Sequence, residues 1–315
     1  MNSPQHIQYL HGNDIDRKKW DECVGHAANG LIYAHSFYLD CMAKSWDALV
    51  LNDYEAVMPL PHRKKWGIDY LFQPFLTPIL GVFGNNISEE FVSDFLNSIP
   101  AKYKLWDISL NHFNKISEKF QRQYKRSNYV LSLGESYDKI RNNYSENITR
   151  NISKADKAGC VLKKDIDVHE IIDVCRKEWV KFTSIEEGTF ENLEEKFAVF
   201  KPYTVTYGVY DRENKLLSSC AFLIDSRRAY YWLVGNDPSA KDVGASPMLI
   251  DGFIRDFAGK NMLLDFEGSD KRSVAEFYQR FGARPEPFIT IYRNRLHFPL
   301  NLLKKTPAHY LSLTS

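Results

Sequence analysis

Residues 241–283 constrain the fold of this chain more than any other stretch, because they contain four local patterns in immediate succession. A turn of small residues at 241–246 is followed by apolar residues at helical spacing, and Gly259 stands where a helix would end. Residues 262–268 then predict a short buried strand, and residues 273–283 predict a second helix. This alternation of helix and strand predicts an α/β unit. The apolar positions of the first helix are Met248, Leu249, Ile250, Phe253, Ile254 and Phe257.

The turn before the first helix has the composition of an anion-binding site. It contains Lys241, Val243, Gly244, Ala245 and Ser246. A turn of this kind leaves backbone N–H groups unpaired at the positive end of the helix dipole, which favours a pyrophosphate group. The alternative interpretation is an ordinary loop that leads into a crossover helix.

The Lys-x-x-Gly-x-Ser turn and the Ala-x-Phe-Tyr-x-x-Phe-Gly helix at 275–282 resemble the C-terminal half of a GNAT-type N-acyltransferase. In that family the turn holds the coenzyme A pyrophosphate, and a Tyr in the last helix protonates the departing thiolate. The resemblance implies acetyl-CoA or another acyl-CoA as the donor substrate. It also implies that the strand at 231–235, with Leu233 and Val234, supplies backbone groups to the pantetheine arm. Lys241 stands where Arg or Gln is usual, and Ser246 where Gly or Ala is usual.

An internal repeat indicates that the α/β unit occurs twice. Residues 91–110 align with residues 249–268 without a gap, and the apolar positions keep the same phase through both the helix and the strand. The alternative is that any two α/β units share this phasing. The identical pairs are Phe95 with Phe253, Lys102 with Lys260, Leu105 with Leu263 and Asp107 with Asp265.

The length of 315 residues also favours two domains, and the repeat places them at 1–134 and 135–315. We therefore predict an α/β fold (α+β in its mixed sheets) of two tandem GNAT-like domains, each a twisted mixed sheet flanked by helices. In the first domain, residues 81–86 precede the repeated helix and contain no basic residue. The first domain is thus predicted to be degenerate, and the second to carry the donor site.

A further segment narrows the resemblance. Residues 144–159 resemble FemAB-like proteins, in which an Arg-Asn-Ile-x-Lys-Ala type of run starts the second of two GNAT folds. Residues 265–269 and the pattern from 37–40 to 58–61 also resemble that group. FemAB-like enzymes of cell-wall synthesis transfer an amino acid from aminoacyl-tRNA to a peptidoglycan-precursor amine, and some carry a coiled-coil arm for which residues 159–205 have no room. The donor thus stays open between a coenzyme A thioester and aminoacyl-tRNA. The acceptor is a small-molecule or peptide amine, and tRNA is a partner only in the FemAB-type interpretation.

Both donors require the same chemistry at the acceptor. The attacking amine must lose a proton, and the leaving group must gain one. Glu267, at the end of the predicted strand, is the candidate base, and its alternative role is a solvated strand-end carboxylate. Tyr278 is the candidate acid because its place matches the family helix, and its alternative role is a core aromatic. Asp265 is the third candidate catalytic residue, and it is either buried and paired or directed into the site.

Composition excludes several other functions. Forty-one basic and forty acidic residues give a net charge of +1, which does not favour a nucleic-acid binder. The five Cys show no Cys-x-x-Cys spacing and the nine His no ligand spacing, so no metal is expected. The longest apolar region, 70–83, is interrupted by Pro74 and Pro78 and should not span a membrane, and without a signal-type N-terminus a cytoplasmic location is expected. A catalytically degenerate GNAT-fold module that only binds a ligand is the alternative function.

The remaining elements follow from periodicity and turn residues. A loop at 183–192 should shape the acceptor pocket. The sequence predicts a hairpin at 48–60, helices at 88–97, 116–124, 137–159 and 168–182, a strand at 105–110, a strand at 129–133 that ends the first unit, a meander at 205–210, 217–224 and 229–234, and a last strand at 288–292.

Overall fold

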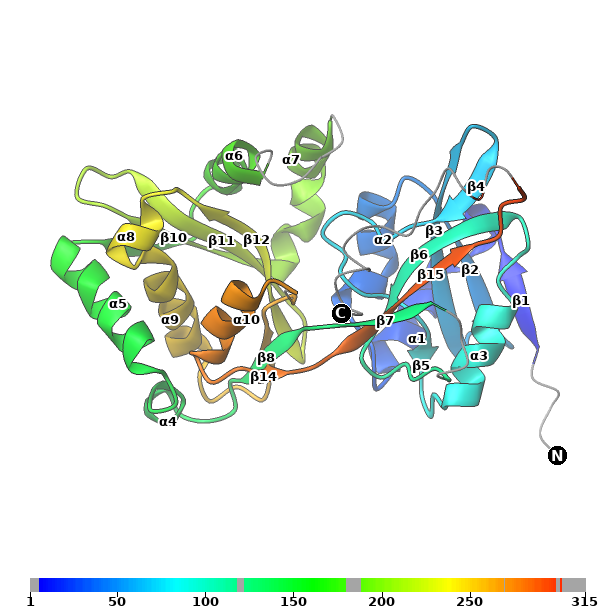
Figure 1. The fold of residues 1–315 in the computed structure, drawn as a ribbon, viewed down its shortest axis with the longest axis horizontal. Helices are drawn as coiled ribbons and strands as arrows, with labels where there is room; N and C mark the ends of the chain where they lie inside the picture. Colours follow the sequence, from blue (N-terminus) through cyan, green and yellow to red (C-terminus); the bar gives the residue numbers. More distant parts are fainter. Residues whose placement is uncertain (1–5, 118–121, 180–187, 269, 299–300, 302–315) are drawn as a thin grey trace. The chain divides into compact units, whose positions relative to one another are not determined.

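A computed structural model describes residues 6–117, 122–179, 188–268, 270–298 and 301 of the chain. The chain divides into two units, and in each a mixed sheet is flanked by helices (Figure 1). The predicted α/β class with mixed sheets is therefore confirmed. The first unit consists of Met1–Ser127 together with Pro287–Ser315, and the second of Asn128–Glu286. The predicted boundaries of 1–134 and 135–315 thus differ from the structure, most clearly at the C-terminal end.

In the part of the chain that the structure describes, the first unit contains an eight-stranded sheet in the order β1-β2-β3-β4-β6-β15-β7, with β5 beside β3. The β4–β6 pair is parallel, and the other strand pairs are antiparallel. The expected hairpin is present as β2 and β3. The strands are β1 (Ile7–Leu10), β2 (Trp46–Leu51), β3 (Ala56–Lys65), β4 (Ile68–Leu71), β5 (Phe83–Gly84), β6 (Tyr103–Leu110), β7 (Gln123–Arg126) and β15 (Phe288–Asn294).

Three α-helices of the described chain belong to the first unit: α1 (Arg17–His26), α2 (Ser36–Met42) and α3 (Glu89–Asn97). The α3 helix begins where the sequence predicts, because the Ser88 hydroxyl accepts a hydrogen bond from the Phe91 amide and caps the helix. Its apolar face then buries Phe95 and Leu96 in the same core as Trp106 of β6. Short 3₁₀ turns lie at η1 (Gly12–Asp14) and η2 (Ile32–Ala34).

The second unit contains a seven-stranded sheet in its described residues, in the order β14-β8-β13-β12-β11-β10-β9. Here the parallel pair is β12–β13, and the predicted meander is present as β10, β11 and β12. The strands are β8 (Tyr129–Ser132), β9 (Val161–Lys164), β10 (Thr204–Tyr210), β11 (Leu216–Ile224), β12 (Arg228–Asn236), β13 (Leu263–Asp265) and β14 (Arg284–Pro285).

Helices cover both faces of this second sheet. Figure 1 shows α6 and α7 on one face and α5, α9 and α10 on the other. The α9 helix buries Leu249, Ile250 and Phe253 in the main core, and the ring of Phe253 stacks on Phe222 of β11 at 3.8 Å. The helices are α4 (Tyr137–Arg141), α5 (Glu146–Ala158), α6 (Val168–Trp179), α7 (Thr189–Phe200), the 3₁₀ turn η3 (Lys201–Tyr203), α8 (Ala240–Val243), α9 (Ala245–Phe257) and α10 (Arg272–Gln279).

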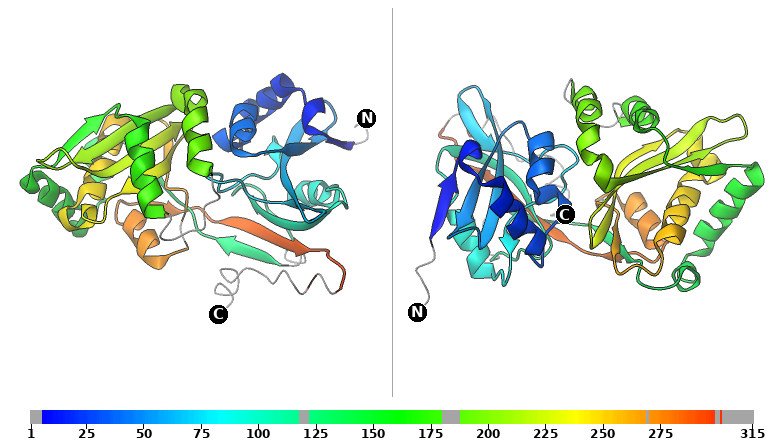
Figure 2. Two further views of the ribbon diagram at one scale, coloured as in Figure 1. Left: turned by 90° about the horizontal axis from the view of Figure 1, so that it is seen from above. Right: turned by 180° about the vertical axis from the view of Figure 1, so that it is seen from behind.

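The two sheets match strand for strand, but they exchange one strand. Each sheet has a parallel pair, then an antiparallel strand, then an edge strand, which gives β4-β6-β15-β7 in the first sheet and β12-β13-β8-β14 in the second. The chain leaves β7 and enters the second sheet as β8, and it leaves β14 and returns to the first sheet as β15. Figures 1 and 2 show the C-terminal β15 beside β6 and β7. The two predicted strands at 129–133 and 288–292 therefore exist, but each belongs to the opposite sheet from the one expected.

One predicted helix is wrong. The sequence predicts a helix at 116–124, whereas Gln123–Arg126 form β7, which pairs with β15. Pairing with a strand far away in the sequence overrides the local helical spacing there. Residues 118–121 lie outside the described residues, as do residues 183–187 of the predicted acceptor loop, and α7 begins soon after them at Thr189. Within the described residues, no helix has both the length and the apolarity needed to cross a membrane.

Candidate active site

The parallel strands β12 and β13 part near the middle of the second sheet. Their pairing ends at Tyr230 and Asp265, although β12 continues to Asn236. The backbones of Glu267 and Gly268 have φ angles of 59° and 80°, so the chain turns away immediately after β13. Beyond Tyr230, the edge of β12 therefore has no backbone partner in β13.

The β12 strand carries a bulge at the point where β13 leaves it. Tyr231 pairs with Phe222 and Leu233 pairs with Ala221, so that Trp232 between them has no partner opposite. A bulge re-aims the backbone groups of the strand. Such irregularities are common beside active sites, and this one coincides with the parting of β12 and β13.

Leu233 and Val234, the predicted pantetheine contacts, lie immediately after this bulge. Leu233 is buried and Val234 is half-buried. The Val234 carbonyl accepts a hydrogen bond from the Trp179 indole at 3.0 Å, and the Val174 side chain closes against Gly235. Trp179 of α6 thus occupies the Val234 carbonyl, a backbone group that the sequence assigns to the pantetheine arm of the donor.

Tyr278 lies on α10, facing the parted end of β13. Its ring stacks on Phe266 at 4.4 Å and meets Tyr231 edge-on at 6.4 Å. Burial raises the pKa of the Tyr278 hydroxyl well above its usual value, and the charge of Glu267 raises it further. The hydroxyl therefore stays protonated at neutral pH, which is the state that a general acid requires.

Glu267 lies close enough to Tyr278 for its charge to act on the Tyr278 hydroxyl. Glu267 is half-buried at the end of β13, and its charge also acts on the Cys220 thiol of β11. Burial raises the pKa of Cys220, Glu267 adds to the increase, and the Trp232 amide that hydrogen-bonds the thiol opposes it. Cys220 is consequently a neutral thiol under the bulge and not a thiolate nucleophile.

Asp265 does not share the face of Glu267. It is buried, and it accepts hydrogen bonds from the Arg228 guanidinium at 2.7 Å and from the Asn128 amide at 2.9 Å. The Glu267 backbone amide donates to it as well, at 2.9 Å. Burial raises the pKa of Asp265, and the nearby Arg228 charge opposes the increase. These contacts engage both oxygens of the Asp265 carboxylate in hydrogen bonds. They favour a structural role for Asp265 over the catalytic role that the sequence suggests.

The predicted anion-binding turn forms α8 and the first turn of α9. Lys241 is exposed and Val243 half-buried on α8, while Gly244 and Ala245 are buried at the start of α9. The Ser246 hydroxyl donates to the Asn236 side chain at 2.7 Å, and Ser218 donates to the same oxygen at 2.6 Å. The side chain of Ser246 thus joins α9 to the end of β12.

This turn fits a pyrophosphate poorly. The Gly244 amide donates to the Ala240 carbonyl, and Pro247 has no N–H, so only the amides of Ala245 and Ser246 remain in this part of the turn. The α5 backbone also lies against it, because a Cβ built on Gly244 would stand 2.2 Å from the Asn151 carbonyl oxygen. Pyrophosphate sites usually offer several convergent amides.

The corresponding place in the first sheet is filled by the chain itself. Beyond the β4–β6 pair, Leu80 donates its amide to the Ser109 carbonyl at 2.8 Å, and its carbonyl accepts from Asn111 at 2.7 Å. The Gln73 side chain accepts from the Ser109 amide at 3.0 Å. A cavity of ≈ 10 Å³ is left there, which is room for about one water molecule.

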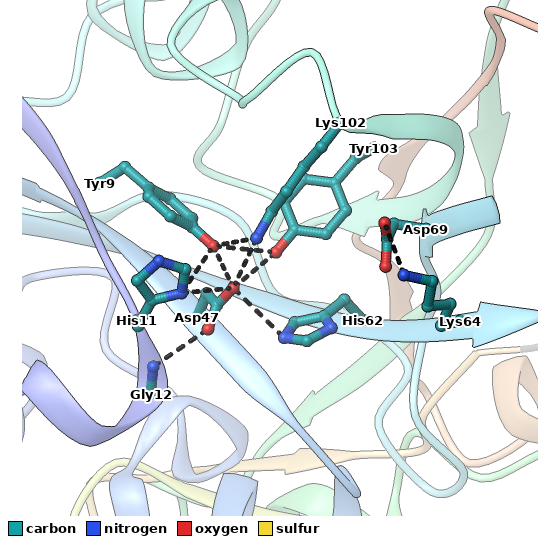
Figure 3. A network of polar contacts seen from close by, with 9 residues as sticks. All are labelled: Tyr9, His11, Gly12, Asp47, His62, Lys64, Asp69, Lys102 and Tyr103. Carbon is teal, nitrogen blue, oxygen red and sulfur yellow. Dashed lines mark hydrogen bonds and ion pairs between the residues drawn. The ribbon is translucent and has the colours of Figure 1, made fainter. Parts of the chain in front are cut away.

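A second polar cluster, around Asp47, lies in the first unit (Figure 3). Asp47 accepts hydrogen bonds from Tyr9, from Tyr103 at 2.7 Å and from the Gly12 amide at 3.0 Å, and His62 lies 3.3 Å away. Burial raises the pKa of Asp47, but the hydrogen bonds from His62, Tyr9 and Tyr103 outweigh it and hold the pKa well below the usual range. This cluster joins β1, β2, β3 and β6. Within the described residues, no group of three or more His, Cys, Asp and Glu could hold a metal ion.

The arrangement of the two sheets is shared with solved structures. FemX matches with a TM-score of 0.62 and 12% identity over 94% of this chain and 99% of its own. The C-terminal domain of a protein described as a lysylphosphatidylglycerol synthetase from Agrobacterium fabrum matches with a TM-score of 0.53 and 11% identity, over 91% of this chain and 94% of its own. The chain has a tandem GNAT-like fold of the FemAB type. L-PGS from Bacillus licheniformis, with a TM-score of 0.52 and 11% identity over 91% of this chain and 95% of its own, has the same fold.

At the level of sequence, a scan of family models and a search of curated proteins gave no match. The FemAB-type fold therefore rests on the structural comparisons, and the resemblance seen in the sequence is confirmed at the level of fold.

Sequence reasoning missed several residues that shape this site. Trp179 and Cys220 look like ordinary apolar positions of a helix and a strand, and Arg228 looks like part of a charged turn. The sequence could have predicted a cation beside Asp265, because a buried carboxylate requires one. Only the pairing of β12 with β13 identifies that cation as Arg228.

Proposed function

We propose that the protein is an acyltransferase that moves an acyl group from an activated ester or thioester to an amine, at the second unit. The observation that carries the proposal is the parting of β12 and β13 beside Tyr278 and Glu267. An acyl carbonyl placed there would lie along the unpaired edge of β12. The GNAT-like fold supports the same reaction class.

The residues have separate roles in this reaction. The amine nitrogen forms a bond to the acyl carbon and passes its proton to Glu267, directly or through water. The bond from the acyl carbon to the donor oxygen or sulfur breaks, and Tyr278 gives its proton to that leaving atom.

The first unit does not carry the donor in this proposal. Gln73 and Leu80 occupy the place that corresponds to the parting of β12 and β13, and the remaining cavity of ≈ 10 Å³ is far too small for an acyl chain. This supports the expectation that the first GNAT-like domain is degenerate.

The start of α9 favours an aminoacyl ester, such as aminoacyl-tRNA, over a coenzyme A thioester. Coenzyme A needs its pyrophosphate held at Gly244 to Ser246, where α5 packs and two amides remain. The amino acid of an aminoacyl-tRNA has no pyrophosphate at that distance. Millimolar coenzyme A should consequently leave the thermal midpoint of unfolding unchanged, whereas a bound donor would raise it. An increase with coenzyme A would assign the thioester donor instead.

Product formation over a panel of amines, with acyl-CoA and aminoacyl-tRNA donors, tests the reaction itself. Tyr278→Phe and Glu267→Gln should each lower kcat by about 10²-fold or more, because each removes a proton-transfer group. Tyr210→Phe is the matched control, since it removes a hydroxyl that donates to Glu170 at 2.9 Å on a strand away from the site. It should leave kcat unchanged. Equal activity of all three variants would rule out the assigned roles.

A second function has its own support. The covered turn at Gly244, with Ser246 held by Asn236, is what a binding module that has lost donor chemistry would show. In that case no amine and donor pair gives product, while an amine ligand still raises the thermal midpoint of the wild type. Turnover that depends on Tyr278 excludes this function.

A further inference from the structure

The tip of the β3–β4 hairpin exposes a tryptophan. Trp66 is 88% exposed, the highest value among the large apolar side chains that the structure describes. It forms the turn together with Gly67, and the two residues have φ angles of 52° and 76°. Two-residue hairpin turns with positive φ at both positions usually contain Asn-Gly, because a bulky side chain is strained there. Folding of the hairpin thus gains nothing from a Trp at this position.

Basic side chains surround this tip. Lys64 and Lys65 precede Trp66 on β3, and the Lys65 ammonium lies 5.1 Å from the centre of the Trp66 ring. Lys64 faces Asp69 across the hairpin, but their charged atoms are 4.0 Å apart and the Lys64 side chain is 63% exposed (Figure 3). Asp69 offsets one of the two lysine charges, so Lys64, Lys65 and Asp69 together keep a net positive charge at the tip.

Further cations lie at the same end of the first sheet. Asp69 pairs with Tyr103 at the start of β6, and the Arg295 amide donates to the Lys104 carbonyl at 2.7 Å. Arg293 and Arg295 both stack over the ring of the buried Trp106, at 4.9 and 4.7 Å. Two guanidinium groups on one ring repel each other. Both guanidinium groups add positive charge at this end of the first sheet.

We infer that this end of the first unit, with Trp66 at its tip, binds the surface of an anionic phospholipid bilayer. Trp places its ring at the depth of the headgroups, and Lys side chains below it reach phosphate and other anionic groups. Trp66, Lys64 and Lys65 have this arrangement on a protruding turn. Single-stranded nucleic acid needs several aromatic platforms along a basic groove, whereas this tip presents one ring.

Sedimentation of the full-length chain with vesicles tests the inference. The wild type should sediment with vesicles of phosphatidylcholine and phosphatidylglycerol, but not with phosphatidylcholine alone, and salt should weaken the binding. Trp66→Asn preserves the turn and removes the ring, and it should weaken partitioning by at least about tenfold. Lys64→Gln with Lys65→Gln should weaken it by roughly 25-fold, since each cation near the surface contributes about fivefold.

The matched control for charge is Lys154→Gln with Lys157→Gln, which removes two exposed cations from α5. That pair should bind vesicles as the wild type does. The inference is overturned if the wild type ignores the anionic vesicles, if the Trp66 and Lys64/Lys65 variants bind as well as the wild type, or if the control loses as much binding as they do. Binding of a single-stranded oligonucleotide without binding of anionic vesicles would also overturn it. Unchanged thermal midpoints of the variants exclude misfolding as the cause.

Discussion

Arg228 lies between two carboxylates, those of Asp265 and Glu286, each 2.7 Å from its Nη1 atom. Its side chain is 8% exposed, and burial lowers its pKa, but the two carboxylates outweigh this effect and raise it. Replacement of Arg228 by Met keeps the volume and leaves Asp265 buried without a cation. The free energy of unfolding should fall by about 3–5 kcal/mol, as measured by urea denaturation.

The exposed pair of Arg272 and Glu276 on α10 provides the control for this prediction. The Arg272 side chain is 93% exposed. Arg272→Met should change the free energy of unfolding by less than about 0.5 kcal/mol, because exposed ion pairs contribute little. Similar losses for the two variants would show that the Arg228 network is not effectively buried.

Asp47 should make stability depend on pH. The pKa of Asp47 is depressed in the folded chain, so its contribution to stability is present above its unfolded pKa of about 4 and is lost as the pH falls below that value. The difference in unfolding free energy between the wild type and Asp47→Asn should therefore be constant from neutral pH down to about 5 and then shrink. Urea denaturation over this range measures it. A difference that stays the same at acidic pH would contradict the assigned network.

At the residue scale, the sequence predicts Tyr278 and Glu267 as the candidate pair, but it does not predict the residues around them. Tyr278 and Glu267 follow from a helix and a strand end that lie close in the sequence. The direction of the Asp265 side chain cannot be predicted in this way. Strand alternation would place Asp265 on the same face as Glu267, but the positive φ of Glu267 ends that alternation. The hydrogen bond from Trp179 to Val234 joins residues far apart in the chain, and no local pattern predicts it.

At the scale of elements, the contact of α5 with the start of α9 can be measured with two glycines. Gly244 and Gly259 have the same φ of 82°, at the two ends of α9. A Cβ at Gly244 would meet the Asn151 carbonyl oxygen at 2.2 Å, whereas a Cβ at Gly259 would meet nothing within 4 Å. Gly259→Ala should cost about 1–2 kcal/mol from backbone strain alone. Gly244→Ala should cost about 1–3 kcal/mol more because α5 must move.

Thermal or urea denaturation of both variants gives this difference directly. Equal costs would show that α5 does not pack against the turn. A pyrophosphate group could then bind at Gly244 without a clash with α5, and coenzyme A would again be the expected donor.

Periodicity predicts the elements that pair with their neighbours in the sequence. The meander of β10, β11 and β12 and the helices α3 and α9 lie where the sequence places them, because their hydrophobic phase and their caps are local. The β7 strand does not, because Gln123–Arg126 become a strand only through pairing with Phe288–Ile291 of β15. That pairing joins segments that are separated in the sequence by the whole of the second unit.

At the scale of the whole molecule, the strand exchange predicts which fragments fold. Residues 128–286 contain every strand of the second sheet, so this fragment should fold alone. Residues 137–315 form a longer fragment, but they lack β8, which lies between β13 and β14. Residues 1–132 lack β15, which lies between β6 and β7. Both of these fragments should be poorly soluble, because the interior of a sheet would be left with unpaired edges.

Circular dichroism and thermal denaturation of the three purified fragments would test this prediction. A well-folded 137–315 fragment would contradict the exchange. The exchange itself is invisible in the sequence, because β8 and β15 have patterns that suit either sheet. Val130 pairs with Asp265, and Ile291 with Ile108, only through the topology of the complete chain.

The exchange also sets the order in which a ribosome can complete the two units. Once Arg284–Pro285 has left the ribosome, every strand of the second sheet has been synthesised. At that moment the first sheet still lacks Phe288–Asn294. Domains usually fold from the N-terminus onward during synthesis. Here the N-terminal unit must hold β6 and β7 apart until the last strand arrives, so the part of the chain that is made first is the part that is finished last.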